Sequence, residues 1–286
     1  MTLLASILID GVAYGMVLFM ISVGLTVTLG LMRVVNLAHG LFAMLGGYLA
    51  ATLMSRFGAA WGVAVAAAAL LVGAAGIALE RVLVRLVYGR PELDQVLLTI
   101  GIAFIGIAAA GVLFGTSIVS VPLPAFLSGV TDLGFRMMPT QRLAAIAAGV
   151  LAAAAIWFLL ERTLFGVRLR ATVDNTQAAQ AVGIETGRIF ALTFALGAAL
   201  AAVGGILGAQ LLPIEPNYVL KYLVLFLAVV AVGGLGSVWG SLIAALVMGV
   251  VETAGKYLMP ELATIGLYGA MLAILTWRPN GLLGKH

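Results

Sequence analysis

One short stretch of the chain gathers residue types that could do chemistry. Arg33, Asn36 and His39 fall within seven residues, and His39 is the only histidine apart from His286. A histidine can act as a general base, as a metal ligand or as a hydrogen-bonding group beside a polar solute. Because long apolar runs flank this stretch on both sides, its polar side chains need a physical reason.

Catalysis at His39 finds little support elsewhere in the sequence. A zinc-dependent intramembrane protease would need His-Glu-x-x-His, which one internal histidine cannot provide. No Gly-x-Ser-x-Gly motif supports a Ser-His dyad, and the absence of cysteine excludes cysteine-based metal and redox sites. An intramembrane hydrolase is therefore a minor alternative. We predict that the chain is not an enzyme and holds no metal.

The composition shows whether the protein is surrounded by water or by lipid. Of the 286 residues, 63% are hydrophobic and 9% are charged, and the mean hydropathy is +1.20. A soluble domain is roughly 25% charged, so this chain cannot cover a surface that faces water. The net charge of +4 is dispersed among loops and does not indicate nucleic-acid binding. The sequence predicts an integral membrane protein in contact with lipid.

The hydrophobic pattern predicts an all-α, polytopic transmembrane bundle that forms a single domain over residues 1–286. A spanning helix needs about 20 apolar residues, whereas barrel strands are roughly half as long and alternate in hydrophobicity. Eight or nine segments qualify, one or two of which we expect to be broken or half-helices. They lie near 7–31, 39–56, 60–80, 95–115, 141–160 and 189–211, twice within 219–257, and near 263–277.

The distribution of basic residues predicts the orientation. With the N-terminus outside, ten lysines and arginines fall on the inner side and five on the outer side. The positive-inside rule therefore favours an outer N-terminus and an inner C-terminus. The inner group is Arg33, Arg81, Arg85, Arg90, Arg162, Arg168, Arg170, Arg188, Arg278 and Lys285; the outer group is Arg56, Arg136, Arg142, Lys221 and Lys256.

Two connections between the hydrophobic segments are long. The outer loop 116–140 contains three prolines and little charge, which predicts a short structured cap. The inner connection 161–188 is the most polar segment of the chain. Within it, good helix formers from Asp174 to Val182 and the following Gly183 predict a short helix outside the lipid.

The stretch around Asn36 and His39 has two interpretations. It is either a hydrophilic turn at the inner surface, with Arg33 reaching the headgroups, or a broken helix inside the bundle whose polar groups face a solute path. A glycine-rich interruption at 233–240 favours the second, because interruptions at corresponding places in two inverted repeats indicate a midplane site. The predicted pathway residues are Asn36, His39, Gly40, Gly234, Gly236 and Ser237.

The chain contains no visible energy source. Its nearest approach to a Walker A loop, Gly255-Lys256-Tyr257, lacks both the upstream glycine and the Ser/Thr. Ion-coupled carriers usually place acidic residues within their helices. Here the acids fall mainly in loops or at segment ends; Asp10 and Glu252 are the most embedded, and neither has an obvious partner in the sequence. The pattern indicates a translocation pathway without its own motor.

Four stretches of the chain carry distinctive motifs. They are Gly24-Leu25-Thr26 with Met32 to Gly40; Arg170-Ala171 with Asp174, Ala178-Ala179 and Gly183-Ile184; Gly233-Gly234-x-Gly236-Ser237-x-x-Gly240; and Arg278-Pro279-Asn280-Gly281-Leu282-Leu283-Gly284. Together these stretches resemble the LivH-type permeases of branched-chain amino acid ABC importers. The resemblance covers nearly the whole chain.

The resemblance implies partners that supply the missing motor. Such permeases sit in the bacterial inner membrane with a homologous second permease, two cytoplasmic ATPases that bind ATP and Mg, and a periplasmic binding protein. It makes 116–140 the periplasmic loop and 161–188 the cytoplasmic coupling segment, and implies a type II-like permease fold. The residues expected to couple to the ATPase are Arg168, Arg170, Asp174, Ala179 and Gly183.

The substrate remains open at this point. Relatives carry branched-chain amino acids, urea, short amides or other amino acids, and nothing in the sequence offers a dedicated clamp for a carboxylate and an ammonium together. A weakly binding conduit agrees with that, because a conduit must release what it admits. The leading expectation is alternating access driven by partner ATPases, and an ATP-independent channel or facilitator is the alternative.

Overall fold

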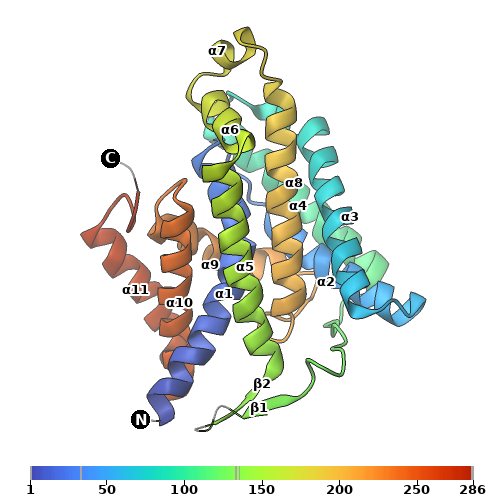
Figure 1. Cartoon of the computed structure of the whole chain (residues 1–286), viewed down its shortest axis with the longest axis vertical. Coiled ribbons are helices and arrows are strands. Elements are labelled where there is room, and N and C mark those ends of the chain that lie inside the picture. The colour runs from blue at the N-terminus through green and yellow to red at the C-terminus, as the bar shows by residue number, and fades with distance from the viewer. Residues whose placement is uncertain (1, 33, 133, 135, 285–286) are drawn as a thin grey trace.

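A computed structural model describes residues 2–32, 34–132, 134 and 136–284 of the chain (Figure 1). Nine apolar helices coincide with the nine predicted hydrophobic segments, which confirms the all-α polytopic bundle. They are α1 Thr2–Gly30, α2 Gly40–Phe57, α3 Trp61–Val82, α4 Glu92–Phe114, α5 Thr140–Arg162, α8 Thr186–Gly208, α9 Tyr218–Gly233, α10 Val238–Leu258 and α11 Ala263–Trp277.

Smaller elements lie in the connections. An antiparallel hairpin, β1 Val130–Asp132 with β2 Met137–Pro139, occupies the loop after α4, where Thr131 pairs with Met138. Two helices, α6 Leu164–Asp174 and α7 Thr176–Ala181, follow α5, and two 3-10 turns lie at Val84–Val87 and Pro260–Leu262. The hairpin and the N-terminus lie at one end of the molecule, and α6 and α7 lie at the other (Figure 1).

Two of the nine helices, α2 and α9, are not among the candidate membrane spans. Within the described residues, seven helices are long and apolar enough to cross a membrane, while α2 has 18 residues and α9 has 16 and neither is among the seven. Both are nevertheless largely buried, with Tyr48 of α2 and Tyr218 of α9 fully enclosed. They are the expected half-helices, and they lie in contact with each other inside the bundle.

The order of the helices divides the bundle into two similar halves. The connection from α1 to α2 and that from α8 to α9 both have nine residues, 31–39 and 209–217. In each half the connection is followed by a short helix (α2 or α9) and a tight turn. A long helix comes next, α3 with 22 residues or α10 with 21. Packing agrees with this correspondence, because α3 lies on α8 as α10 lies on α1. Since α1 and α8 run in opposite directions (Figure 1), the repeat is inverted.

This correspondence corrects the predicted pairing of the two interruptions. The counterpart of the Asn36–His39 stretch is the segment 209–217, and the glycine-rich stretch corresponds instead to the short turn 58–60 between α2 and α3. Gly58 and Gly234 occupy matching places and both have positive φ. Sequence inspection missed the pair because 209–217 is interrupted by Pro213 and Pro216 rather than by glycine.

Close backbone contacts at glycines hold the central helices together. A Cβ at Gly24 of α1 would lie 2.6 Å from the Cα of Gly197 of α8, and one at Gly249 of α10 would lie 2.4 Å from the Gly11 carbonyl oxygen. Such approach is characteristic of membrane helix pairs, because lipid supplies no hydrophobic drive for helix association. Gly111, in contrast, meets no neighbouring atom and does not mark a helix contact within the chain.

Candidate functional site

The break between α1 and α2 is held in place by side chains of α4. Residues 35–37 make no helix, so their backbone groups need partners that lipid cannot provide. The Gln95 carboxamide accepts a hydrogen bond from Val35 N at 2.8 Å, and the Thr99 hydroxyl accepts one from Leu37 N at 3.2 Å. The Thr99 hydroxyl also lies 3.3 Å from the Val35 carbonyl oxygen. Two polar side chains therefore replace the missing helix bonds.

The break lies deep in the bundle. His39 Nε2 donates a hydrogen bond of 2.9 Å to the carbonyl oxygen of Ile21, and His39 and Asn36 are 2% and 1% exposed. Ile21 lies nine residues before the end of α1, which corresponds to about 14 Å along the helix axis. Of the two interpretations, a surface turn is therefore wrong. Arg33 lies outside the described residues.

Polar atoms in this region lack partners within the described part of the chain. Asn36 Nδ2 is a buried donor without an acceptor, His39 Nδ1 is a buried acceptor without a donor, and the Ser22 hydroxyl is also unpaired. Leaving one such group unsatisfied costs about 1–3 kcal/mol. Water or a polar solute is the usual partner of such groups. The arrangement suits transient binding of a small polar molecule.

The His39 ring makes one side-chain hydrogen bond in this geometry. The one hydrogen bond of the His39 ring goes to a backbone carbonyl, and within the described residues no serine hydroxyl bonds to it. No group of three metal-ligating side chains occurs in the described ranges either. The ring instead meets Phe42 edge-on at 5.6 Å. The Ser-His hydrolase alternative therefore has no structural support.

The short helix α2 contacts both α9 and the second break. Gly40 at the start of α2 faces Val219 and Phe226 of α9, and Gly47 of α2 faces Ile214 in the second break. The same Ile214 accepts a hydrogen bond from Val119 N at 2.9 Å, which joins the second break to the loop that follows α4. The two breaks and the crossing of α2 and α9 thus form one connected region.

The glycine-rich stretch occupies a different place. A Cβ at Gly30, the last residue of α1, would overlap the backbone of Gly236, so this stretch lies at the end of α1, away from Ile21. Ser237 caps α10 by accepting a hydrogen bond from Gly240 N at 3.0 Å. The structure therefore does not bring Gly234, Gly236 and Ser237 together with Asn36 and His39.

The C-terminal segment explains why that stretch is rich in glycine. Leu282 N donates to the Val232 carbonyl oxygen at 2.7 Å, and Leu283 N donates to that of Gly233 at 3.2 Å. These bonds satisfy carbonyl groups that the end of α9 leaves free. A Cβ at Gly234, where φ is +96°, would lie 2.4 Å from Gly284 N. The glycine-rich and C-terminal motifs form one packing unit.

The polar connection after α5 differs from the single short helix that the sequence predicted. Asp174 ends α6 instead of starting the helix, and Asn175 caps α7 by accepting from Ala178 N at 2.9 Å. Within α6, Leu169 is fully buried whereas Leu164 and Val167 are exposed. The predicted stop is confirmed: Gly183 has a φ of +85°, and Ile184 N closes the turn on the Ala179 carbonyl oxygen.

The predicted coupling residues are not equivalent in this geometry. Arg168, Asp174 and Gly183 are exposed, whereas Ala179 is buried. Arg170 is bound within the chain, since it donates to the Leu160 carbonyl oxygen at 2.7 Å and lies 3.7 Å from the Glu161 carboxylate.

A second hydrophobic core fixes α6 to the bundle. Leu169 packs with Val27 of α1 and Ile189 of α8, and Phe165 and Val238 lie at the edge of this cluster. Val27, Ile189 and Val238 belong to α1, α8 and α10, so this cluster brings α6 together with the ends of three helices of the bundle. The core provides a mechanical connection between the exposed segment and the bundle.

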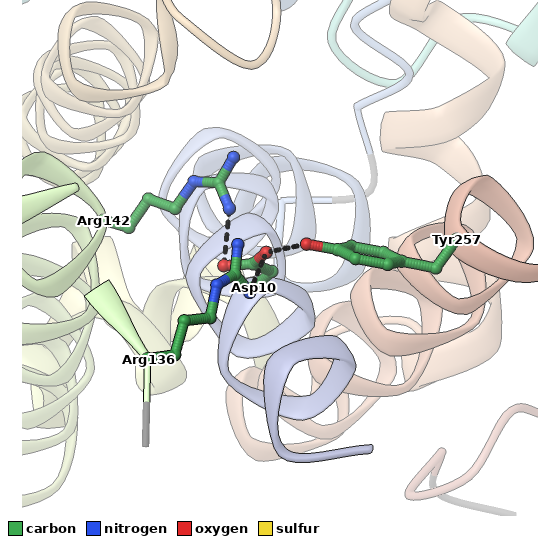
Figure 2. A network of polar contacts seen from close by, with 4 residues as sticks. All are labelled: Asp10, Arg136, Arg142 and Tyr257. Carbon is green, nitrogen blue, oxygen red and sulfur yellow. Dashed lines mark hydrogen bonds and ion pairs between the residues drawn. The ribbon is translucent and has the colours of Figure 1, made fainter. Parts of the chain in front are cut away.

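At the opposite end, Asp10 has the partners that the sequence did not reveal. Its buried carboxylate lies 3.1 Å from Arg136, accepts a hydrogen bond from Tyr257 at 2.7 Å and forms an ion pair with Arg142 (Figure 2). Glu252 is paired as well, with Lys256 at 2.9 Å. The Asp10 cluster thus joins α1, α5, α10 and the segment that leads into β2.

The same cluster affects the pKa of Arg136, which precedes β2. Burial lowers the pKa of Arg136, but hydrogen bonds with Tyr257 and Asp10 outweigh it, and the pKa is raised overall. Two cations therefore share the one carboxylate of Asp10.

Comparison with known proteins gives consistent matches over nearly the whole chain. Residues 7–276 match the family model described as branched-chain amino acid transport system / permease component. The permease protein LivH of Salmonella typhimurium is 28% identical over 96% of this chain and 94% of its own length. BraD of Pseudomonas aeruginosa is 27% identical over 97% and 95%. LivM of Escherichia coli is 27% identical over 96% of this chain and 69% of its own. No solved structure matches significantly.

We predict that Thr99→Val destabilises the protein by about 1–2 kcal/mol, because Leu37 N–H is left without a partner inside the bundle. The measurement is the thermal unfolding midpoint in nanodiscs. Thr276→Val is the matched control, since the exposed Thr276 hydroxyl bonds only to the carbonyl oxygen one turn earlier in its own helix. An equal fall in both variants would contradict the role of Thr99.

We predict that Asp10→Asn loosens the hairpin end of the bundle. Two arginines that are each about one-third exposed lose their negative partner, and the expected loss is on the order of 2 kcal/mol. Trypsin should then cleave faster after Arg136, and the unfolding midpoint should fall. Glu261→Gln removes an exposed carboxylate as a control. Unchanged cleavage in Asp10→Asn would show that the cluster does not secure the hairpin.

Proposed function

Because the chain belongs to the family of branched-chain amino acid transport permease components, we propose that it is a permease subunit of an ATP-binding-cassette importer for branched-chain amino acids. The family match over residues 7–276 carries this proposal. LivH and BraD are both named as permeases of high-affinity branched-chain amino acid transport systems, and each aligns with at least 96% of this chain. The chain is a multi-pass membrane protein, for which we propose the bacterial inner membrane.

The proposed partners follow from the same relatives. The chain is similar both to LivH and to LivM of Escherichia coli, two permeases named for the same kind of transport system. We therefore propose a pair of homologous permease subunits. Two cytoplasmic ATPases that bind ATP and Mg would drive the pair, and a periplasmic binding protein would deliver the substrate. This chain itself has no recognisable nucleotide-binding loop.

The proposed orientation places the hairpin end in the periplasm and α6 and α7 in the cytoplasm. The distribution of lysine and arginine in the sequence supports it. With this orientation the C-terminus is cytoplasmic, and the exposed residues Arg168, Asp174 and Gly183 are available to an ATPase. Arg170 and Ala179 would shape the segment from within, since one bonds to Leu160 and the other is buried.

The proposed substrate pathway uses the region where the two breaks meet. Asn36 and His39 supply an unpaired donor and an unpaired acceptor beside the crossing of α2 and α9, and Gly40 permits the close approach of α9. Gly234, Gly236 and Ser237 lie at the end of α1, beside the second core, so we propose that they form the cytoplasmic end of the pathway. Alternating access would open the crossing to one side at a time.

The deciding experiment is uptake of labelled leucine into proteoliposomes that contain the permease pair, the ATPases and the binding protein. The proposal predicts that uptake needs ATP and all of these components. Uptake by the permeases alone, without ATP, would show a channel or facilitator instead. Uptake of urea or a short amide in place of leucine would change the substrate and leave the importer class intact.

We predict that Leu169→Ala separates ATP hydrolysis from transport. The second core would lose its central side chain, so movement of α6 would no longer reach α1 and α8. Uptake per ATP hydrolysed should fall several-fold in these proteoliposomes while the ATPases remain bound. The control is Val167→Ala, which changes a half-exposed residue of the same helix. Equal coupling ratios in both variants would contradict transmission through this core.

A further inference from the structure

The first turn of α9 contains a charge that its own helix does not explain. Lys221 is the only charged residue among the sixteen of α9, whose sequence is otherwise apolar and aromatic. An ionisable residue inside such a helix is expensive in a membrane and usually marks a functional site with a specific partner. The partner here is Glu215 of the second break, whose carboxylate is in direct contact with the Lys221 ammonium.

The contribution of this ion pair to the stability of the fold is too small to explain its presence. The side chain of Lys221 is 49% exposed and that of Glu215 is 21% exposed. An ion pair with that much solvent contributes about 0–1 kcal/mol. The pair is accessible, and opening it costs little.

The surroundings of the pair are aromatic and polar. The Lys221 ammonium lies 5.5 Å from the centre of the Tyr222 ring, and Tyr218 packs against Tyr222 at 4.8 Å. The hydroxyl groups of Tyr218 and of Tyr48 are buried and have no partner in the described part of the chain. Glu215 is near enough to Tyr48 to interact with it electrostatically. The unsatisfied Tyr48 hydroxyl near this pair of opposite charges points to a polar ligand.

We propose that Glu215 and Lys221 form a site for the two charges of an α-amino acid zwitterion. The ammonium group of the ligand binds Glu215, and its carboxylate binds Lys221 and the N-terminal turn of α9, where the helix dipole favours negative charge. One ion pair is exchanged for two, and no charge is left unpaired. Leu220 and Val224, which are 41% and 51% exposed, flank Lys221 and provide an apolar surface for an aliphatic side chain.

The site rests on the proposed function, because it names the substrate class of the same pathway. It selects amino acids over urea and short amides, since a neutral amide cannot replace either partner of the ion pair. A ligand with a single charge would leave Glu215 or Lys221 without its counter-charge. The location is suitable for substrate binding, because Ile214 of the second break contacts both the Val119 loop and Gly47 of α2.

The first test measures ligand binding with the permease pair in nanodiscs, without the binding protein. The unfolding midpoint is followed against L-leucine, leucinamide, 4-methylpentanoate and urea. L-Leucine should raise the midpoint of the wild type more than the other three compounds. Equal protection by all four would overturn the proposal, and this result does not depend on the folding of any variant.

The second test compares substitutions that remove one charge. Glu215→Gln and Lys221→Met should weaken L-leucine binding at least tenfold, and Lys221→Arg should stay within about threefold of the wild type. The matched control is Lys256→Met, which breaks the Lys256–Glu252 pair of α10, a pair with similar exposure. Binding by Glu215→Gln and Lys221→Met that equals binding by Lys256→Met would overturn the site.

The two proposals fail in different ways. If leucine uptake by the complete complex is ATP-dependent while Glu215→Gln and Lys221→Met bind leucine like the wild type, the importer stands and the site is overturned. If these variants lose leucine binding while wild-type uptake needs no ATP, the site stands and the importer is overturned.

Discussion

The structure depends on one constraint: inside a membrane every backbone polar group must find a partner within the protein. A helix meets this constraint by itself, but the break between α1 and α2 does not. Gln95 and Thr99 of α4 meet it from outside the break, and the Ile21 carbonyl receives the His39 ring. Because these bonds are made across helices, the Val35 and Leu37 amides have partners although the non-helical segment lies deep in the bundle.

The inverted repeat contains two such breaks, and different residues provide the hydrogen-bond partners of each break. In the first half, side chains of α4 satisfy the break. In the second half, the backbone of Val119 pairs with Ile214, and two prolines reduce the number of donors that need a partner. Since α2 lies against the second break and its first residue follows the first break directly, movement of α2 changes the surroundings of both breaks. Such an arrangement suits a pathway that must open at alternate ends.

Polar groups at the two ends of the bundle serve different purposes. At the hairpin end the Asp10 cluster ties four parts of the chain together with buried charge (Figure 2). At the other end, α6 is held mainly by the apolar contacts of Leu169. Apolar contacts are not directional and tolerate sliding, whereas an ion cluster fixes geometry. The molecule thus has one rigid end and one end suited to transmit movement.

The sequence by itself determined that the protein lies in a membrane, that it is all-α and where its nine apolar helices lie. Each of these features depends on local hydrophobicity and length. It also located the short helix before Gly183, since capping and helix propensity are local. Only the tertiary structure decided the depth of His39, the correspondence of 31–39 with 209–217 and the partners of Asp10. These features rest on contacts between distant residues, such as Asp10 and Arg136, which are 126 positions apart. A local sequence pattern does not show which distant side chain a residue will contact.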